Sequence, residues 1–249
     1  MITTQKILHN LKITALNKMQ EAVVEASSKK EDVVLLSPTG SGKTLAFLLT
    51  VLQHVQEEKD GIQALIVVPS RELGLQIEQV FKQMKTGLKV NCCYGGHSTK
   101  IEKQNLEHAP AVLIGTPGRL AFHIRNEYVH TATIKLIVLD EFDKALEFGF
   151  KEDMSFIIGS LTNLKTRMLT SATNLTDLPD FTGIKKYSTL NFLEKNNKSV
   201  TLQLKTVQAE NADKLDVFVN LIGKLGHSSS IVFCNHREAV GRISDLLKS

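Results

Sequence analysis

The sequence has no tryptophan, five prolines, three cysteines and only 6% aromatic residues among its 249 residues. So little cysteine and proline excludes a small disulfide scaffold, a collagen-like chain and a proline-rich disordered chain. The three cysteines also form neither an even disulfide set nor the paired spacing of a metal site. We therefore expect free thiols in strands, in a reducing compartment, at Cys92, Cys93 and Cys234.

Long hydrophobic runs are missing as well. The longest apolar stretch, around residues 45–52, is far too short to span a bilayer, and residues 1–6 contain no apolar signal segment. Thirty basic and 26 acidic residues give a net charge of +4, which permits a polyanionic partner without requiring one. With 42% hydrophobic residues, we expect a globular cytoplasmic protein without a membrane partner.

Short apolar runs recur along the chain and alternate with segments of helical spacing, such as 45–52 and 73–81. Continuous apolar runs of this length are typical of strands that are buried on both faces. The alternation predicts an α/β fold with a mostly parallel sheet between two layers of helices. The runs lie at 33–36, 64–68, 90–94, 111–114, 136–139 and 168–170.

Each apolar run is followed directly by small or polar residues. Any one of these segments could be an ordinary turn, because Gly, Pro, Ser and Asp are common turn formers. Six of them at the carboxyl ends of parallel strands, however, would meet at one edge of the sheet, where α/β proteins bind ligands. The segments are 37–44, 69–72, 95–96, 115–119, 140–143 and 171–173.

The chain divides into two parts by pattern. We predict a first domain over 1–190, ending in a strand at 185–190, and a linker over the Asn- and Lys-rich residues 191–199. In 200–249 the pattern predicts a strand near 200–204, two helices and a buried strand at 231–233. About fifty residues bury too little surface to fold alone, so we expect this second α/β unit to be truncated.

The segment from Ser37 to Thr44 carries the strongest chemical signal. A loop with two glycines can turn its N–H groups toward an anion, and the helix that follows adds the positive end of its dipole. Lys43 would then contact the β- and γ-phosphates of a nucleotide, and the Thr44 hydroxyl would coordinate Mg²⁺. The segment departs from G-x-x-x-x-G-K-[ST] only at Ser37, and a chance turn is the alternative. The predicted phosphate-binding residues are Thr39, Gly40, Ser41, Gly42, Lys43 and Thr44.

Asp140 and Glu141 follow the apolar run at 136–139. Next to a phosphate loop, a carboxylate in this place can hold Mg²⁺ through water. We assign this role to Asp140. Glu141 is placed to orient or deprotonate an attacking water. Alone, this acidic pair would indicate a solvated turn. The glycine-rich loop upstream favours a catalytic pair that uses ATP and Mg²⁺.

The chain resembles the DEAD-box RNA helicases of helicase superfamily two, because it contains the family's segments in the family's order. The resemblance runs from Gln20 to the second-domain segment at 231–235, and implies a RecA-like first domain followed by the start of a second. The segments are Ser-Pro-Thr-Gly-Ser-Gly-Lys-Thr (37–44), Pro-Ser-Arg-Glu-Leu (69–73), Gly-Gly (95–96), Thr-Pro-Gly-Arg-Leu (116–120), Asp-Glu-Phe-Asp (140–143) and Ser-Ala-Thr (171–173).

The resemblance implies further roles. Gln20 looks like the family's adenine reader, with a surface helix glutamine as the alternative, and the Pro-Thr usual beside it is missing. Ser171 and Thr173 would couple the nucleotide state to domain closure through hydrogen bonds with Asp143. Phe142 stands where the family has Ala, which puts the local packing and the rate in question.

For RNA, the resemblance points to three loops with glycine amides, hydroxyls and two guanidinium groups. Such groups suit phosphate and sugar contacts, so we expect little sequence specificity. The alternative for Arg71 is an ion pair with Glu72. The residues are Pro69, Ser70, Arg71, Gly95, Gly96, Thr116, Gly118 and Arg119.

Our leading interpretation is an RNA-dependent ATPase that locally separates short duplexes when ATP closes two domains over one strand. The family's arginine finger belongs to the later part of the second domain, so we expect this chain to bind ATP but hydrolyse it slowly. An ATP-gated RNA clamp without unwinding is the first alternative. A DNA-directed or nucleic-acid-independent ATPase is the second.

Overall fold

The computed structural model describes residues 2–29, 31–175, 177–193, 203–209, 214–226 and 228–248. The chain divides into two compact units, Met1–Asn196 and Asn197–Ser249, which are described separately below. Among the described helices, none combines the length and the apolar character that crossing a bilayer requires.

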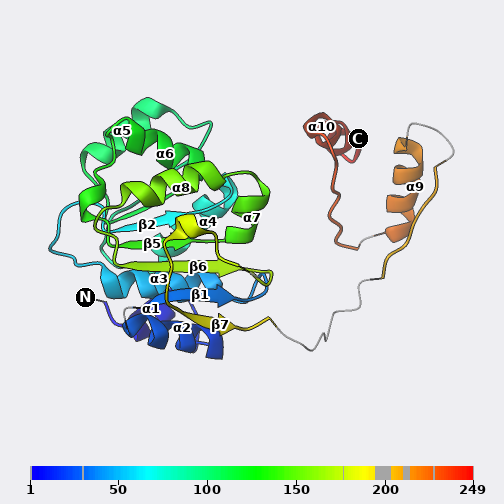
Figure 1. Ribbon diagram of the computed structural model, residues 1–249. Coiled ribbons are helices and arrows are strands. Elements are labelled where there is room, and N and C mark those ends of the chain that lie inside the picture. Colours follow the sequence, from blue (N-terminus) through cyan, green and yellow to red (C-terminus); the bar gives the residue numbers. More distant parts are fainter. Residues whose placement is uncertain are drawn as a thin grey trace. The chain divides into compact units, whose positions relative to one another are not determined.

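The first unit contains a sheet of seven strands, all paired in parallel, in the order β3-β4-β2-β5-β6-β1-β7 (Figure 1). All seven strands predicted for this unit are confirmed, with ends that shift by one or two residues. Their bounds are β1 Asp32–Leu36, β2 Ala64–Val67, β3 Val90–Cys93, β4 Val112–Gly115, β5 Leu136–Leu139, β6 Thr166–Ser171 and β7 Tyr187–Asn191.

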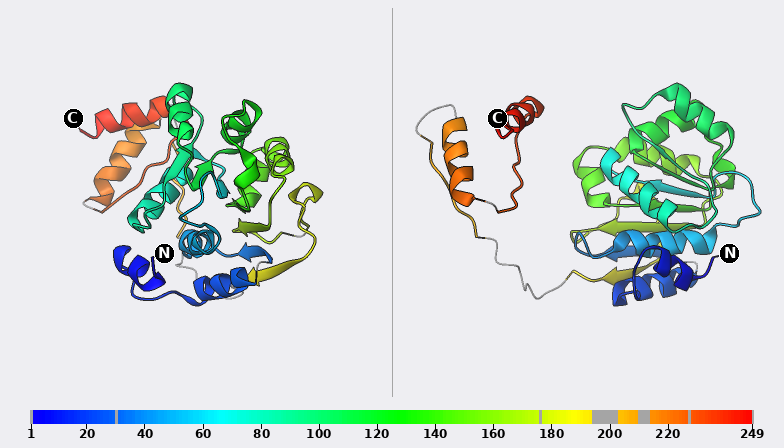
Figure 2. Two further views of the ribbon diagram at one scale, coloured as in Figure 1. Left: turned by 90° about the vertical axis from the view of Figure 1, so that its left-hand side faces the viewer. Right: turned by 180° about the vertical axis from the view of Figure 1, so that it is seen from behind.

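Helices cover both faces of this sheet, as the left-hand view of Figure 2 shows. One core lies under α1 (Thr4–Asn10), α2 (Lys18–Ser28), α3 (Lys43–His54) and α4 (Arg71–Gln83). A second core lies under α5 (Thr99–Glu107), α6 (Pro117–Arg125), α7 (Phe142–Glu147) and α8 (Lys151–Ser160). Two short 3₁₀ helices, η1 (Thr131–Thr133) and η2 (Asp180–Thr182), complete the described elements of this unit.

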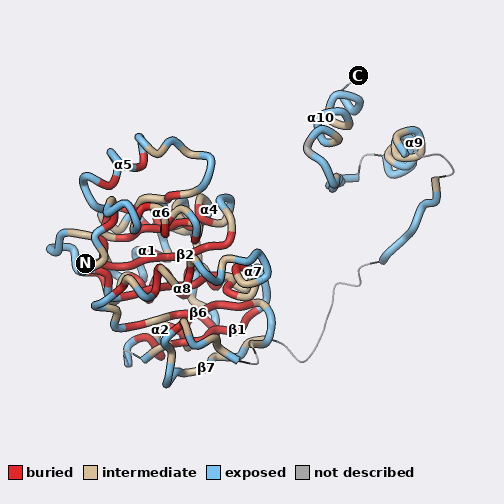
Figure 3. The backbone as a smooth tube through the Cα atoms, turned by 45° about the horizontal axis from the view of Figure 1, so that its top comes forward, coloured by how far each residue is buried: buried red, intermediate tan, exposed pale blue. Residues whose placement is uncertain are grey.

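The apolar runs become strands because both of their faces are covered. Successive side chains alternate between the two cores, so that Val33 and Leu35 pack on one face and Val34 and Leu36 on the other. The central strands are accordingly buried along their length in Figure 3. The edge strand β7 instead alternates exposed and half-buried residues. The RecA-like three-layer prediction is confirmed for this unit.

The second unit shows α9 (Leu215–Leu225) and α10 (Arg237–Leu246), which confirms the two predicted helices. The prediction of a buried strand at 231–233 is wrong, since the backbone there forms no strand and Ile231 and Phe233 are 82% and 92% exposed. A strand needs a hydrogen-bonded neighbour, and the described part of this unit provides none. Cys234 therefore lies outside a strand, whereas Cys92 and Cys93 lie in β3.

The described residues include only part of the segments for which we made the other predictions in this region. The structure extends β7 to Asn191, one residue into the predicted linker 191–199, and residues 194–199 lie outside the described residues. Residues 200–202 of the strand expected near 200–204 lie outside them too, and residues 203 and 204 have no regular structure. The domain boundaries stay a prediction.

Two glycines test the tight packing of this fold in opposite directions. A Cβ at Gly115, the last residue of β4, would lie 2.6 Å from the Cys93 carbonyl oxygen and 2.8 Å from Leu120 Cγ. We expect Gly115→Ala to lower the free energy of unfolding by about 1–3 kcal/mol. A Cβ at Gly159 in α8 would have no described atom within 4 Å, so Gly159→Ala should raise it by up to about 1 kcal/mol. Urea unfolding would measure both, and equal effects would contradict the packing described.

Candidate functional site

The loop between β1 and α3 has the backbone that the sequence predicts. Gly40 and Gly42 adopt left-handed φ angles of +78° and +91°, and a Cβ at Gly42 would lie 2.6 Å from Gln20 Nε2. Because α3 begins at Lys43, its first amides lie beside this loop. The loop borders a cavity of about 410 Å³, which is lined by Thr39, Gly40, Gly42, Lys43, Thr44, Leu73, Gln76, Asp140 and Glu141.

Lys43 places a positive charge in the wall of this cavity. Its side chain is buried, and Nζ donates hydrogen bonds to the carbonyl oxygens of Ser37 at 2.7 Å and Pro38 at 3.0 Å. Burial lowers the pKa of Lys43, and the nearby charges of Asp140, Glu141 and Asp143 act against that shift. An anionic ligand in the cavity would stabilise the charged form further.

Asp140 places a buried carboxyl group in the same cavity. It is 3% exposed, and the Thr170 hydroxyl donates a hydrogen bond to its Oδ1. Burial raises the pKa of Asp140 to about 6, because the Thr170 bond and the Lys43 charge only partly compensate for lost water. Asp140 and the Thr44 hydroxyl are oxygen ligands of the kind that Mg²⁺ prefers, so the residues present fit this ion.

Glu141 follows with a strained backbone. Its φ of +48° lies in the left-handed region, which is uncommon for residues other than glycine. Its N–H donates to Thr170 Oγ1 at 3.1 Å. The Thr170 hydroxyl therefore joins Asp140 to Glu141 and fixes the two acidic residues relative to each other.

The predicted coupling residues meet at the end of β6. Thr173 Oγ1 donates to Asp143 Oδ2 at 2.8 Å, as the resemblance implies. Ser171 Oγ instead donates to the Thr173 carbonyl at 2.8 Å, so Ser171 reaches Asp143 only through Thr173. Phe142 is fully buried, with its ring 6.2 Å from that of Phe181. The departure from Ala at this position thus fills the core.

Gln20 lies beneath the phosphate loop. It is 6% exposed, which excludes the surface-glutamine alternative. Its amide oxygen accepts from the Asn17 N–H at 2.9 Å, and its Nε2 donates to the Gly42 carbonyl at 3.2 Å. Contact with adenine stays a prediction. A cavity of about 540 Å³ borders the loop on the β7 side and is lined by Asn17, Lys18, Met19, Ser37, Pro38, Ser41, Asn191, Phe192 and Leu193.

The three loops predicted to bind RNA follow β2, β3 and β4, which are neighbours in the sheet. Ser70 caps α4 by accepting the Leu73 N–H at 3.2 Å. The Arg71 guanidinium lies 4.7 Å from the centre of the Tyr94 ring, a different contact from the ion pair with Glu72 considered above. Pro69 and Ser70 lie in the loop between β2 and α4. Thr116 directly precedes α6, whose first turn contains Gly118 and Arg119. Gly95 and Gly96 are exposed.

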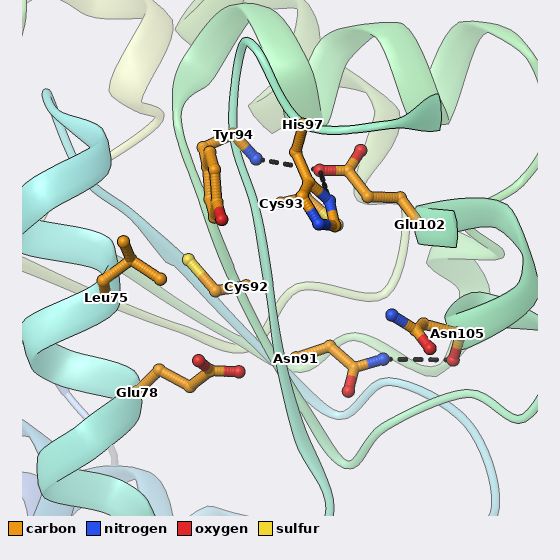
Figure 4. A pocket seen from close by; sticks show the side chains of 9 residues that line it. All are labelled: Leu75, Glu78, Asn91, Cys92, Cys93, Tyr94, His97, Glu102 and Asn105. Atoms are coloured by element: carbon orange, nitrogen blue, oxygen red, sulfur yellow. Dashed lines mark hydrogen bonds and ion pairs between the residues drawn. The ribbon is translucent and has the colours of Figure 1, made fainter. Parts of the chain in front are cut away.

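Arg119 is held by a residue that the sequence analysis missed. Its Nε donates to Glu102 Oε2 at 2.6 Å, and His123 Nε2 lies 2.6 Å from the same oxygen. Glu102 lies beside His97 and Tyr94 in Figure 4. Burial alone would raise the pKa of Glu102, but the hydrogen bonds from His123, Arg119 and the Tyr94 N–H hold it below its usual value.

Four functional positions had no signal among the strand ends and motifs of the sequence. Glu102 and His123 lie inside helices, away from the strand ends. Gln76 lies in the second turn of α4 and enters the phosphate cavity only because α4 packs beside it. Thr170 directly precedes Ser-Ala-Thr, so a wider window around that segment would have included it.

Comparison with known proteins agrees with this geometry. The family model for the DEAD/DEAH box helicase matches residues 17–180. The chain is 34% identical over 252 residues to the ATP-dependent RNA helicase DBP4 of Kluyveromyces lactis, covering 95% of this chain and 33% of the relative. It is 37% identical over 170 residues to the DEAD-box ATP-dependent RNA helicase RhpA of Helicobacter pylori strain B128, covering 68% of this chain and 34% of the relative.

A solved structure leads to the same family. The crystal structure of a DEAD box protein from the hyperthermophile Methanococcus jannaschii matches with a TM-score of 0.69 and 25% identity, covering 97% of this chain and 66% of that one. The chain spans about a third of the length of the curated relatives it matches. From the matched family model, the relatives and the cavity around Lys43 and Asp140, we conclude that the chain belongs to the DEAD/DEAH box helicase family and contains its first RecA-like domain.

Proposed function

We propose that this chain is the ATP-binding part of an RNA-stimulated ATPase that locally unwinds short RNA duplexes. The observation that carries the proposal is the single cavity in which the phosphate loop, Lys43 and Thr44 face Asp140 and Glu141. Positioning and charge neutralisation are most of what phosphoryl transfer requires from a protein. This cavity offers both, because cationic, hydroxyl and acidic groups line one space.

Each of these residues has a separate task in the proposed reaction. The loop amides and Lys43 bind the phosphates, and Thr44 and Asp140 are the residues that would hold Mg²⁺. When bound, Mg²⁺ neutralises charge on the phosphate oxygens. Glu141 would accept a proton from, or orient, the attacking water. Thr173 and Asp143, already hydrogen-bonded to each other, would transmit the nucleotide state to the RNA-facing side.

RNA is the proposed partner for two reasons. The relatives described above are named RNA helicases. The loops after β2, β3 and β4 also present exposed glycine amides beside Arg71, and such groups contact phosphates without reading bases. We therefore propose binding that is largely independent of sequence. RNA rather than DNA would be favoured through its 2′-hydroxyl groups.

We also propose that this chain alone binds ATP and hydrolyses it slowly. An arginine finger contributes a factor of about 10³ to 10⁵ in related reactions. Among the described residues that line the cavity around Lys43 and Asp140, none is an arginine.

Lys43→Ala tests nucleotide binding. Removing the buried ammonium deletes charge-assisted contacts with phosphate, so we expect Mg·ATP affinity to fall about 10- to 100-fold. Isothermal titration calorimetry would measure the change, with the exposed Lys151→Ala in α8 as a matched control of unchanged affinity. A wild-type chain that takes up no adenine nucleotide would refute the proposal.

Thr170→Val tests the arrangement of the acidic pair. The substitution preserves shape and removes the hydroxyl between Asp140 and Glu141, so the hydrolysis rate should fall about tenfold or more while ATP affinity changes little. Single-turnover hydrolysis with enzyme in excess would measure the rate. The buried Thr166→Val at the other end of β6 serves as control, and an equal loss in both variants would argue against a role of the hydroxyl.

The third measurement compares nucleic acids. At one stated salt concentration, RNA should stimulate ATP hydrolysis more than DNA of equal length, and RNAs of different sequence should act alike. Phosphate release would be followed with each oligonucleotide in turn. Equal stimulation by DNA would favour a DNA-directed ATPase, and no stimulation by either would favour a function without nucleic acid.

A further inference from the structure

The loops after β2, β3 and β4 must keep a fixed arrangement if they are to hold one strand of RNA. The main chain gives them only limited connections, such as the hydrogen bond from the Thr116 N–H to the Cys93 carbonyl at 3.1 Å. Gly95 and Gly96 are exposed and have open space around them, and Gly96 has a φ of +83°. A turn of this kind needs support from side chains to stay in one conformation.

That support comes from Glu102 of α5. Its side chain is 1% exposed and points toward the β3–α5 turn in Figure 4. Oε1 accepts the Tyr94 N–H at 3.1 Å and lies 3.4 Å from His97 Nδ1. Since Tyr94 and His97 flank the two glycines, one carboxylate oxygen is hydrogen-bonded to one end of the turn and lies close to the other end.

The other oxygen of Glu102 binds the loop after β4. Oε2 accepts the Arg119 Nε–H at 2.6 Å, and Arg119 Nη2 donates to the His97 carbonyl at 3.2 Å and to Thr99 Oγ1 at 2.9 Å. The Arg119 guanidinium is thus engaged within the protein, and its side chain is only 15% exposed. Arg119 therefore suits a role in joining two loops better than a direct phosphate contact.

The loop after β2 joins the same network through aromatic contacts. The Arg71 guanidinium lies 4.7 Å from the Tyr94 ring centre, and the Tyr94 and His97 rings are 5.2 Å apart. Cation–π contacts of this kind stabilise an arginine in place while its N–H groups stay available. All three loops are therefore linked, directly or through Tyr94 and His97, to Glu102.

The cluster also has the composition of a metal site. Ligand atoms of Cys93, Glu102 and His123 lie within 4.8 Å of one another. However, Glu102 already accepts several hydrogen bonds and its charge is compensated by Arg119. Burial raises the pKa of the Cys93 thiol far above its usual value, so in the absence of an ion the sulfur keeps its proton. A hydrogen-bonded network explains the cluster without an ion.

We propose that Glu102 is the positioning residue of the RNA-facing loops and that Arg119 acts through Glu102 instead of binding RNA itself. The inference rests on the proposed RNA binding. It deepens that proposal, because one buried carboxylate that lies outside the three loops would hold them in a fixed arrangement. The remaining contacts with RNA would then come from the glycine amides and Arg71.

The first measurement is hydrogen exchange on the chain without RNA. Glu102→Gln keeps the side-chain shape but removes the charge facing Arg119, so amides in 94–99 and 116–120 should exchange at least about tenfold faster. Glu107→Gln, an exposed glutamate at the end of the same helix, makes the same change in charge and should leave these amides unchanged. Unchanged exchange in Glu102→Gln would overturn the proposal.

The second measurement is a double-mutant cycle of RNA affinity. Fluorescence anisotropy with a labelled uridine decamer would compare Glu102→Gln, Arg119→Gln and the double variant, with Mg·ATP affinity measured alongside. We expect each single variant to bind RNA about tenfold more weakly, the double variant to bind no worse than either, and ATP affinity to stay within about twofold. Additive losses would show that Arg119 binds RNA independently and would overturn its assigned role.

A milder variant covers the case in which Glu102→Gln does not fold. Thr99→Val removes one hydrogen bond to Arg119 from a half-buried residue, and should weaken RNA binding about two- to tenfold. RNA affinity equal to wild type in Thr99→Val would overturn the positioning role while leaving RNA binding intact. A wild-type chain that binds ATP but no RNA would instead refute the proposed RNA binding, and the exchange data would still report on the network.

Discussion

The structure depends on the parallel alignment of its seven strands. Parallel strands end at the same edge of the sheet, so residues from distant parts of the sequence meet there without any long-range sequence signal. The strand order then decides which ends are neighbours. β1, β6 and β5 lie side by side and bring the phosphate loop to Thr170 and Asp140, while β2, β4 and β3 bring together the three loops assigned to RNA. Two groups of loops on one edge can therefore serve two ligands.

Buried charges at this edge are arranged differently in the two groups. Near the phosphate loop, compensation is incomplete: Lys43 has a lowered pKa, Asp140 has a pKa of about 6, and burial is the main cause of both. Around Glu102 compensation is nearly complete, and the pKa of that carboxyl is lowered despite burial. Buried groups whose charge the protein compensates only in part are suited to bind a charged ligand that supplies the missing compensation. A buried charge that the protein compensates almost completely, as at Glu102, is suited to fixing structure.

Much of the sheet and of the phosphate cavity could be predicted from the sequence, because the patterns that indicate them lie in short continuous segments. Apolar runs such as 136–139 are long enough to identify a strand buried on both faces. Asp140 directly follows that strand, and Lys43 lies at the end of the glycine-rich segment that follows β1. The failures have an equally physical basis. Ile231–Phe233 has the composition of a buried strand, but composition does not supply the neighbouring strand that it needs. Glu102 has helical surroundings in sequence, and only the packing of α5 beside α6 makes it the partner of Arg119.

Arg119 shows that a residue in a sequence motif can be bonded within the protein instead of being free to contact a ligand. A motif residue is usually assumed to contact the ligand, and Arg119 lies in one of the three segments that the resemblance assigns to RNA. Its three described hydrogen bonds nevertheless end on Glu102, His97 and Thr99. A guanidinium with several donors in one plane can fix two loops as effectively as it can bind a phosphate. Conversely, Gly95 and Gly96 have no side chain to offer, and under the proposed positioning role Tyr94, His97 and Glu102 keep their amides in place. In that proposal Glu102 and Arg119 hold the loops, and the glycine amides and Arg71 are left to contact RNA.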